Sequence, residues 1–348
     1  MECLNYPIYF KESFDSLTDA FACAGLKGKR ACIITDQNVS ALYLNEIQDK
    51  ISAKAFEFIP GEASKNLDVI RRIYEFFLDA RMDRGSVAVA LGGGVAGDIA
   101  GFAAATFMRG ITLVQIPTTL LSQADSSVGG KTGVDMGGHK NLIGAFYQPA
   151  FVYINISALD TLAPDQFSSG IAEVIKAALI ADPEFFEILV KEKEHIRKRE
   201  KSVLLDVVKR TVQIKASVVN KDEKEKGVRE ILNFGHTFGH ALESISHFNL
   251  LHGHCVALGI MAALYLSQKY GGINNNLLYS VRQLFEYFNL PTKIKGLRPQ
   301  DIFDQMLFDK KNRGGRIRLV LLESPGNAII NQTADEDSIM EAIRSIIE

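Results

Sequence analysis

The stretch VAVALGGGVAG (residues 87–97) decides the fold of the first half of the chain. Its first five residues are apolar, as in a buried strand, and the glycines that follow match the pattern G-x-G-x-x-G at the start of a helix. Backbone amides in such a loop suit a pyrophosphate. Residues 112–117, about twenty positions further on, carry no acid to hold a ribose, so the pattern departs from the usual dinucleotide motif. The glycines alone are equally typical of a plain turn, but Asp98 and Thr118-Thr119 favour a function.

Strand-like and helical segments alternate around this stretch. Residues 31–35 and 111–117 are typical of further strands, and residues 66–80 and 97–108 have helical periodicity. This alternation predicts a parallel sheet with helices on its faces. From about Leu159 onward helical patterns dominate. They cover residues 165–181, 183–219, 230–246, 253–270, 274–289, 299–307 and 336–347. We therefore predict an α/β domain over 1–157 and an all-α domain over 158–348.

Composition excludes several classes of protein. The 348 residues carry a net charge of −2, which favours neither nucleic acid nor an anionic membrane as a partner. No apolar run approaches the ~20 residues of a transmembrane helix, and the N-terminus MECLNYPIYFKESF lacks a signal-peptide pattern. The four cysteines form no CxxC pair, as in a reduced, cytoplasmic protein.

A second glycine-rich loop, DSSVGGKTG (residues 125–133), is similar to a P-loop. A P-loop needs glycine where this chain has Asp125, so a P-loop ATPase is not expected. Nearby cationic and polar side chains, Lys131, His139, Lys140 and Asn141, are typical of a loop that collects anionic groups. A solvated surface loop is the alternative.

Five of the seven histidines, His236, His240, His247, His252 and His254, lie in one short stretch. Histidine is a frequent zinc ligand and proton carrier, so a metal site is the leading hypothesis. His236 and His240 share a helical face, but HTFGH lacks the glutamate of the zincin motif. Glu173 and Lys176 also share a helical face. They form either a surface ion pair, which the pattern alone favours, or part of a site.

Six blocks of this sequence together resemble the 3-dehydroquinate synthase family over essentially the whole chain. They are GGGVAGDIAGFAAATFMRG (92–110), IPTTLLSQADSSVGGKTGVD (116–135), HKNLIGAFYQP (139–149), GIAEVIK (170–176), NFGHTFGHALES (233–244) and LHGH (251–254). The resemblance implies a Rossmann-like N-terminal domain and an α-helical C-terminal domain, with the active site in the cleft between them. It also implies NAD, one divalent metal and a homodimer. Zinc is the usual metal, and cobalt would also suit such ligands.

The implied reaction converts 3-deoxy-D-arabino-heptulosonate 7-phosphate to 3-dehydroquinate and phosphate. It proceeds by transient oxidation by NAD, β-elimination of phosphate, re-reduction and intramolecular aldol closure. The resemblance places the metal on Glu173, His236 and His252, which leaves a coordination position for substrate. It gives catalytic roles to His240, Glu225, Lys131 and Lys176, with His240 as a proton carrier and Glu225 as a general base.

Further contacts follow from the same resemblance, motif by motif. Substrate contacts are expected from Arg109 of the partner subunit and from Asp125, Lys131, Asn141, Lys176, Lys215, Arg229, Asn233, His240 and Lys310. NAD contacts are expected from Asp36, Asn38, Glu62, Lys65, Gly93, Gly94, Val95, Ala96, Gly97, Asp98, Thr118, Thr119, Lys131, Lys140 and Thr161.

One position departs from the family pattern. His254 stands where the family usually has glutamate, which is either a tolerated change or one that alters the orientation of His252. Three alternatives stay open: a related cyclase acting on sedoheptulose 7-phosphate or glucose 6-phosphate, a polyol dehydrogenase of the glycerol dehydrogenase type, and a non-catalytic nucleotide-binding protein. Arg229, Asn233 and His240 favour the dehydroquinate synthase interpretation.

Overall fold

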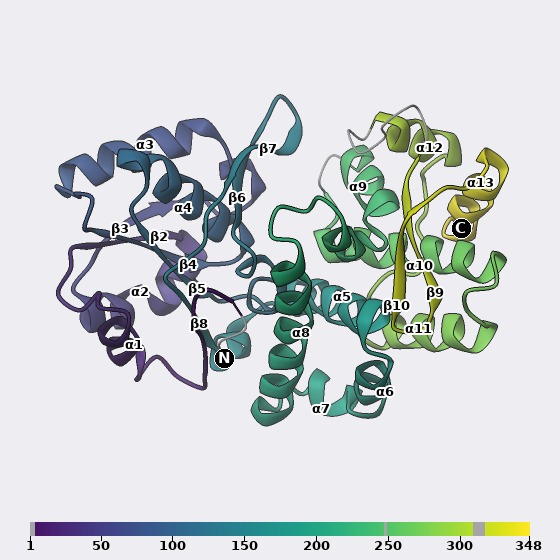
Figure 1. Ribbon diagram of the computed structural model, residues 1–348, viewed down its shortest axis with the longest axis horizontal. Coiled ribbons are helices and arrows are strands. Elements are labelled where there is room, and N and C mark those ends of the chain that lie inside the picture. The colour runs from purple at the N-terminus through teal and green to yellow at the C-terminus, as the bar shows by residue number, and fades with distance from the viewer. Residues whose placement is uncertain (1–3, 247–248, 309–316) are drawn as a thin grey trace. The chain divides into compact units, whose positions relative to one another are not determined.

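The computed structural model describes residues 4–246, 249–308 and 317–348 (Figure 1). The chain divides into two compact units, with unit 1 ending at Leu162 and unit 2 beginning at Ala163. The boundary predicted after residue 157 falls inside the short 3-10 helix η4 (Ile156–Thr161), the last element of unit 1.

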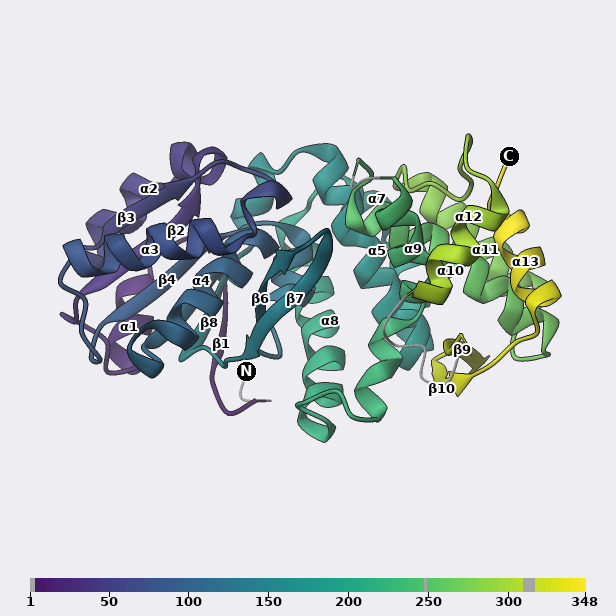
Figure 2. The same ribbon diagram turned by 90° about the horizontal axis from the view of Figure 1, so that it is seen from above.

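Unit 1 is built on a six-stranded parallel sheet, as predicted. The strands in spatial order are β1 (Ile8–Lys11), β8 (Phe151–Asn155), β5 (Thr112–Pro117), β4 (Val87–Gly92), β2 (Ala31–Asp36) and β3 (Lys54–Phe58). The main helices are α1 (Leu17–Cys23), α2 (Gln37–Ile51), α3 (Leu67–Asp79) and α4 (Gly94–Thr106). A separate antiparallel pair, β6 (Lys131–Met136) and β7 (His139–Phe146), is visible in Figure 2.

Both faces of the large sheet are covered by helices. Side chains alternate across each strand, so that Ile33 and Val89 face α1 and α2, while Ile34 and Ala90 face α3 and α4. Figure 1 shows these two helical layers on opposite sides of the sheet. This burial explains why the strand sequences are continuous apolar runs, which is typical of parallel strands buried on both faces.

The order of the strands creates a switch point beside β2. From β2 the chain continues to β3 on one side, then returns to β4 on the other side of β2. In open parallel sheets, ligands bind beyond the carboxyl ends of the strands at such a point. Asp36 ends β2 and Gly92 ends β4. Gly92 has a φ of +152°, and a Cβ there would lie 2.7 Å from Cβ of Ala96, so a larger residue would disrupt this turn.

Unit 2 is mainly helical, which confirms the prediction for the second half of the chain. Its helices are α5 (Pro164–Ala181), α6 (Pro183–Lys191), α7 (Lys193–Arg197), α8 (Lys201–Lys221), α9 (His236–Ile245), α10 (His252–Lys269), α11 (Asn275–Tyr287), α12 (Pro299–Phe308) and α13 (Glu336–Ser345). Helices α5 and α10 pack together and are buried over most of their lengths. None of the described helices is long and apolar enough to cross a bilayer.

The structure corrects three details of the predicted helices. The segment predicted as one helix over 183–219 is three helices, because Glu192 leaves the helical conformation between α6 and α7, and Arg199, with a φ of +58°, lies between α7 and α8. Gly235, with a φ of +78°, divides the segment 230–246 into the 3-10 helix η5 (Val228–Asn233) and α9. Unit 2 also contains an antiparallel pair, β9 (Leu319–Ser324) and β10 (Asn327–Gln332), which helical periodicity did not predict.

Candidate functional site

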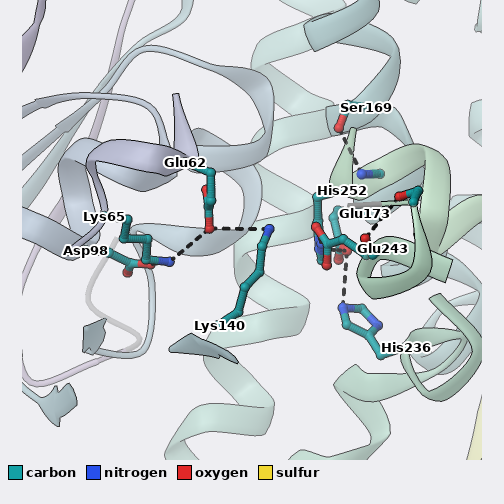
Figure 3. A network of polar contacts seen from close by, with 11 residues as sticks. Glu62, Lys65, Asp98, Lys140, Ser169, Glu173, His236, Glu243 and His252 are labelled. Atoms are coloured by element: carbon teal, nitrogen blue, oxygen red, sulfur yellow. Dashed lines mark hydrogen bonds and ion pairs between the residues drawn. The ribbon is translucent and has the colours of Figure 1, made fainter. Parts of the chain in front are cut away.

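Unit 2 brings together the three side chains predicted to bind metal. Glu173 lies on α5, and His236 and His252 are the first residues of α9 and α10. Oε1 of Glu173 is 3.5 Å from Nε2 of His236 and 3.5 Å from Nε2 of His252 (Figure 3). One ligand atom from each residue lies within 4.8 Å of the others. A carboxylate oxygen and two imidazole nitrogens that converge in this way match the donors that zinc takes in catalytic sites.

A close approach of α10 to α5 makes this convergence possible. Gly253 follows His252 directly, and its backbone N–H donates a hydrogen bond of 3.0 Å to Oγ of Ser169. A Cβ at Gly253 would lie only 1.9 Å from the carbonyl oxygen of Ser169. Ser169 lies one helical turn before Glu173, so this contact places the start of α10 beside the carboxylate.

Glu173 and Lys176 form a buried ion pair, so the surface pair that the pattern favoured is wrong. The exposed fractions of the two residues are 2% and 3%, and Nζ of Lys176 contacts Oε2 of Glu173. Burial alone would raise the pKa of Glu173, but the charges of Lys176 and His252 outweigh it and hold the pKa at about 2. Glu173 is therefore ionised at neutral pH, as a metal ligand must be.

Both predicted imidazole ligands present Nε2 to Glu173. Nδ1 of His236 lies 3.2 Å from the carbonyl oxygen of Phe234, to which it can donate. Nδ1 of His252 faces the carboxylate of Glu243 at 3.6 Å. Burial lowers the pKa of His252, but the carboxylates of Glu173 and Glu243 more than reverse this and raise it to about 9. The donor set therefore fits a divalent cation, which would displace the proton from His252.

His240 lies beside this group without belonging to it. Its ring centroid is 5.2 Å from that of His236, with the ring planes perpendicular, and 6.4 Å from that of His252. Within the described residues, the group of mutually close ligand atoms contains Glu173, His236 and His252 but not His240. This placement suits a residue that acts on a molecule bound next to the cation. His247 lies outside the described residues.

The segment before α9 presents two predicted substrate residues, Arg229 and Asn233, and the predicted general base Glu225. Nδ2 of Asn233 donates a hydrogen bond of 2.8 Å to Oε1 of Glu225. Arg229 is 1% exposed, and its Nη1 donates to the carbonyl oxygen of Glu223. Asp222 holds this loop, because its Oδ2 accepts from the backbone amides of Gly227 at 2.7 Å and Arg229 at 3.1 Å. Sequence reasoning missed Asp222, although an aspartate directly after a long helix is a typical turn signal.

Two further predicted lysines of the substrate set belong to unit 2. Lys215 is buried on α8, with 8% of its surface exposed. Lys310 lies outside the described residues.

Within the described residues, His254 does not belong to the group of mutually close ligand atoms. It lines a pocket with Arg282, Leu290 and Glu348, and its Nε2 is buried without a hydrogen bond to any described residue. Burial lowers its pKa. Glu243, not His254, faces Nδ1 of His252, and both interpretations of the change at 254 stay predictions.

Unit 1 places the glycine loop at the switch point of its sheet. Gly93 caps α4 without a side-chain hydrogen bond, and α4 begins at Gly94. A Cβ at Gly93 would lie 3.1 Å from Cγ2 of Thr119, and one at Gly94 would lie 3.3 Å from Oγ of Ser126. This narrow cradle of backbone amides fits a pyrophosphate. It contains the predicted residues Gly93, Gly94, Val95, Ala96, Gly97 and Asp98, and Thr118 and Thr119 follow the adjacent strand β5.

Asp36 places a carboxylate beside the glycine loop, whereas the sequence that follows the loop contains no acid at the usual spacing. Its Oδ1 accepts from the backbone amides of Asn38 at 3.0 Å and Val39 at 3.2 Å, which caps α2. Its Oδ2 lies 3.6 Å from the position of a Cβ on Gly92 and so faces the loop. The acid comes from the neighbouring strand β2, an arrangement that spacing along the chain did not predict.

Four of the other predicted NAD residues form an ion-pair network (Figure 3). Buried Lys65 contacts Asp98 at 2.6 Å and Glu62 at 3.7 Å, and Lys140 contacts Glu62 at 3.3 Å. Burial would lower the pKa of Lys65, but the charges of Asp98 and Glu62 raise it, so Lys65 is a cation. Thr161, another predicted NAD residue, is not part of this network; its Oγ1 lies 2.5 Å from the hydroxyl oxygen of Tyr43.

The remaining predicted residues of unit 1 occupy loops and the β6–β7 pair. Asp125 lies in the π-helix η3 (Ser122–Ser126), and Lys131 is exposed at the start of β6. Asn141 has a φ of +53°, and its backbone amide donates to Oδ1 of Asp135 at 2.8 Å. Arg109 is exposed and has a φ of +69°, an uncommon conformation for a non-glycine residue.

Comparison with solved structures places this architecture in a known fold class. The chain resembles 2-epi-5-epi-valiolone synthase from Streptomyces hygroscopicus with a TM-score of 0.89 and 24% identity, covering 99% of this chain and 97% of that one. It resembles a 2-deoxy-scyllo-inosose synthase with a TM-score of 0.85 and 24% identity, covering 97% and 96%. The fold of this chain is therefore the one that these two synthases share.

Sequence comparison narrows the class to one family. Residues 55–169 match the family model described as 3-dehydroquinate synthase N-terminal, and residues 170–312 match the one described as 3-dehydroquinate synthase C-terminal. A curated 3-dehydroquinate synthase from Acetivibrio thermocellus is 44% identical over 344 residues, which cover 97% of this chain and 95% of that protein. The chain belongs to the 3-dehydroquinate synthase family.

Proposed function

We propose that this chain is a 3-dehydroquinate synthase, a lyase that converts 3-deoxy-D-arabino-heptulosonate 7-phosphate to 3-dehydroquinate and phosphate. The observation that carries the proposal is the convergence of Glu173, His236 and His252 in unit 2, with the buried cation Lys176 at the same carboxylate. A non-catalytic nucleotide-binding protein would have no use for this arrangement. The curated relatives named 3-dehydroquinate synthase support the assignment.

The proposal includes NAD and a divalent cation, zinc or cobalt, as cofactors. The valiolone synthase structure is described with NAD⁺ and Zn²⁺, and the inosose synthase structure with NAD⁺ and Co²⁺. NAD supplies a hydride acceptor that is regenerated in each turnover, and the cation supplies Lewis acidity at a substrate oxygen. Glu173, His236 and His252 would hold the cation, and the loop from Gly93 to Asp98 would hold the pyrophosphate of NAD.

The cationic residues suit a substrate that carries a phosphate and a carboxylate. Lys131, Lys176 and Lys215 supply point charges, and the planar guanidinium of Arg229 can hold an oxyanion bidentately. Asp222 and the carbonyl oxygen of Glu223 fix the position of Arg229 before substrate arrives. The main contribution of the cationic residues is to hold a reactive substrate in one geometry.

His240 and Glu225 are the proposed proton carriers. The ring of His240 lies next to those of His236 and His252, where a molecule bound at the cation would be within its reach. Glu225 accepts a hydrogen bond from Asn233, which helps to fix the orientation of its carboxylate. Asp125, Asn141 and Lys310 complete the proposed substrate contacts.

The oligomeric state and the location of the protein belong to the same proposal. We infer a homodimer in which Arg109 contacts the substrate phosphate held by the partner subunit. The exposure and left-handed conformation of Arg109 support this role, because backbone strain of this kind is retained where function needs it. Among the described cysteines, Cys23, Cys32 and Cys255 form no disulfide, which supports the proposal of a cytoplasmic enzyme.

One assay tests the reaction against its alternatives. Purified protein with a catalytic amount of NAD and with Zn²⁺ is given the heptulosonate phosphate, and inorganic phosphate is measured together with absorbance of NADH. We expect phosphate release over many turnovers without accumulation of NADH. Stoichiometric NADH would indicate a dehydrogenase. Phosphate release from sedoheptulose 7-phosphate or glucose 6-phosphate, but not from the heptulosonate, would indicate a related cyclase.

A further inference from the structure

Glu243 is a buried carboxylate that the proposed reaction does not use. It lies on α9 and is 4% exposed, although a carboxylate is rarely buried without a specific partner. It follows His240 by three residues and His236 by seven, so all three side chains share one face of the helix. Glu243 thus points in the same direction as the predicted metal ligand on its own helix.

The carboxylate of Glu243 faces His252 across the gap between α9 and α10. Its Oε1 lies 3.6 Å from Nδ1 of His252, while Nε2 on the other side of the ring lies 3.5 Å from Oε1 of Glu173 (Figure 3). The imidazole is therefore held between two carboxylates from different helices. Its ring nitrogens are not equivalent, since only Nε2 faces the atoms that would share a cation.

The two predicted imidazole ligands are oriented in different ways. Nδ1 of His236 faces the carbonyl oxygen of Phe234, two residues away, so the local backbone fixes that ring. His252 has no such local acceptor among the described residues, and 30% of its side chain is exposed. The carboxylate of Glu243 faces Nδ1 of His252 instead, at 3.6 Å. An acceptor at Nδ1 holds the proton there and leaves the lone pair of Nε2 for a cation.

We propose that Glu243 is a positioning residue that orients His252 through Nδ1 and thereby raises the affinity of unit 2 for a divalent cation. This inference rests on the proposed function, because it requires that His252 bind the cation. The alternative is a structural role, in which Glu243 stabilises the packing of α9 on α10 and has no effect on the cation. The two roles predict different results for a variant that folds.

Glu243→Gln removes the charge with little change in shape, and Glu341→Gln is the matched control. Glu341 is also an ion-paired carboxylate on a helix of unit 2, but its partner is Lys269. We expect the dissociation constant for Zn²⁺, measured by competition with a chromogenic chelator, to rise by about 10- to 100-fold in Glu243→Gln. Glu341→Gln should match the wild type. Circular dichroism and thermal melting without metal identify the variants that fold.

Two spectroscopic measurements separate positioning from structural support. In the Zn²⁺-loaded wild type, ¹⁵N NMR of the histidine rings should show His252 protonated at Nδ1, and Glu243→Gln should weaken or lose this signature. The visible spectrum of the Co²⁺-loaded protein should change in Glu243→Gln but not in Glu341→Gln. Unchanged affinity, ring signature and spectrum in a folded Glu243→Gln would overturn the proposal.

The metal site on which the proposal rests is tested separately. If wild type and His252→Ala bind Zn²⁺ equally, His252 is not a ligand and the proposed metal site itself fails. If wild type binds one equivalent of Zn²⁺, His252→Ala does not, and Glu243→Gln binds as tightly as wild type, only the role of Glu243 fails.

Discussion

Nε2 of His252 lies 3.5 Å from Oε1 of Glu173, although the two residues belong to different helices. His252 begins α10, and Glu173 lies within α5. This relationship joins a histidine from the conspicuous cluster to a carboxylate far away in the sequence. Because Glu173 is ionised and buried, its charge is available to a cation with little screening by water. The predictions below follow from this group and from the contacts that support it.

Removing either partner of this pair should abolish metal binding and turnover together. Glu173→Gln and His252→Ala each delete one of three proposed ligands, so we expect less than one equivalent of Zn²⁺ by elemental analysis and no phosphate release. Glutamine is used at 173 because it keeps a polar partner for buried Lys176, whereas breaking a buried ion pair by truncation costs about 3–5 kcal/mol. Full metal content in both variants would contradict the ligand set.

His240→Ala should keep the metal and lose rate. His240 is not among the mutually close ligand atoms, but its ring lies next to those of His236 and His252. A general acid or base contributes about 10²- to 10⁴-fold to a rate, so kcat should fall in this range while the Zn²⁺ content stays at one equivalent. Loss of the metal in His240→Ala would show that His240 binds the cation together with His236, and that the proposed ligand set with Glu173 is wrong.

Gly253→Ala should weaken the site without touching a ligand. The added Cβ would meet the carbonyl oxygen of Ser169 at 1.9 Å, so α10 must move away from α5 and carry His252 with it. We expect lower Zn²⁺ affinity and a loss of about 1–3 kcal/mol in the free energy of unfolding from overpacking. Chemical denaturation and chelator competition measure the two effects. Gly271→Ala is the control, since no atom lies near a Cβ there, although its φ of +80° adds some strain.

The stability contributed by Asp182 should disappear in acid. Asp182 accepts hydrogen bonds from Arg210 at 2.7 and 2.9 Å and also caps α6. The Arg210 guanidinium holds the pKa of this carboxyl below its ordinary value of 3.8. A lowered pKa stabilises the fold at pH values above the ordinary pKa, and the stabilisation is lost as pH falls through the folded pKa.

Asp182→Asn tests this dependence because asparagine keeps the helix cap. At pH 7 we expect the variant to lose about 1 kcal/mol in the free energy of unfolding, since both partners are partly exposed. As the pH falls below 3.8 and through the lowered pKa of folded Asp182, the unfolding midpoints of variant and wild type should converge. A difference that stays constant with pH would show that the ion pair contributes nothing.

The fold of unit 1 was predictable because local patterns decide it. Continuous apolar strands such as 87–91 and the glycines after them specify a buried parallel strand and a tight turn, whatever the rest of the chain does. The hairpin β9–β10 and the break at Arg199 were not predictable in the same way. A short strand or a single left-handed residue produces no hydrophobic periodicity in the sequence. At such positions tertiary packing overrides the helix propensity of the neighbouring residues.

By itself the sequence determined the order of elements, the concentration of histidine and, through its resemblance to a family, the residues of interest. Only the tertiary structure decided which of them meet. Spacing along one helix favoured His236 with His240, but the approach of α10 to α5 at Gly253 joins His236 and His252 to Glu173. Spacing also left the glycine loop without an acid, which β2 supplies as Asp36. In both cases the decisive contact is between elements, because helix and strand packing brings residues far apart in sequence close together in space.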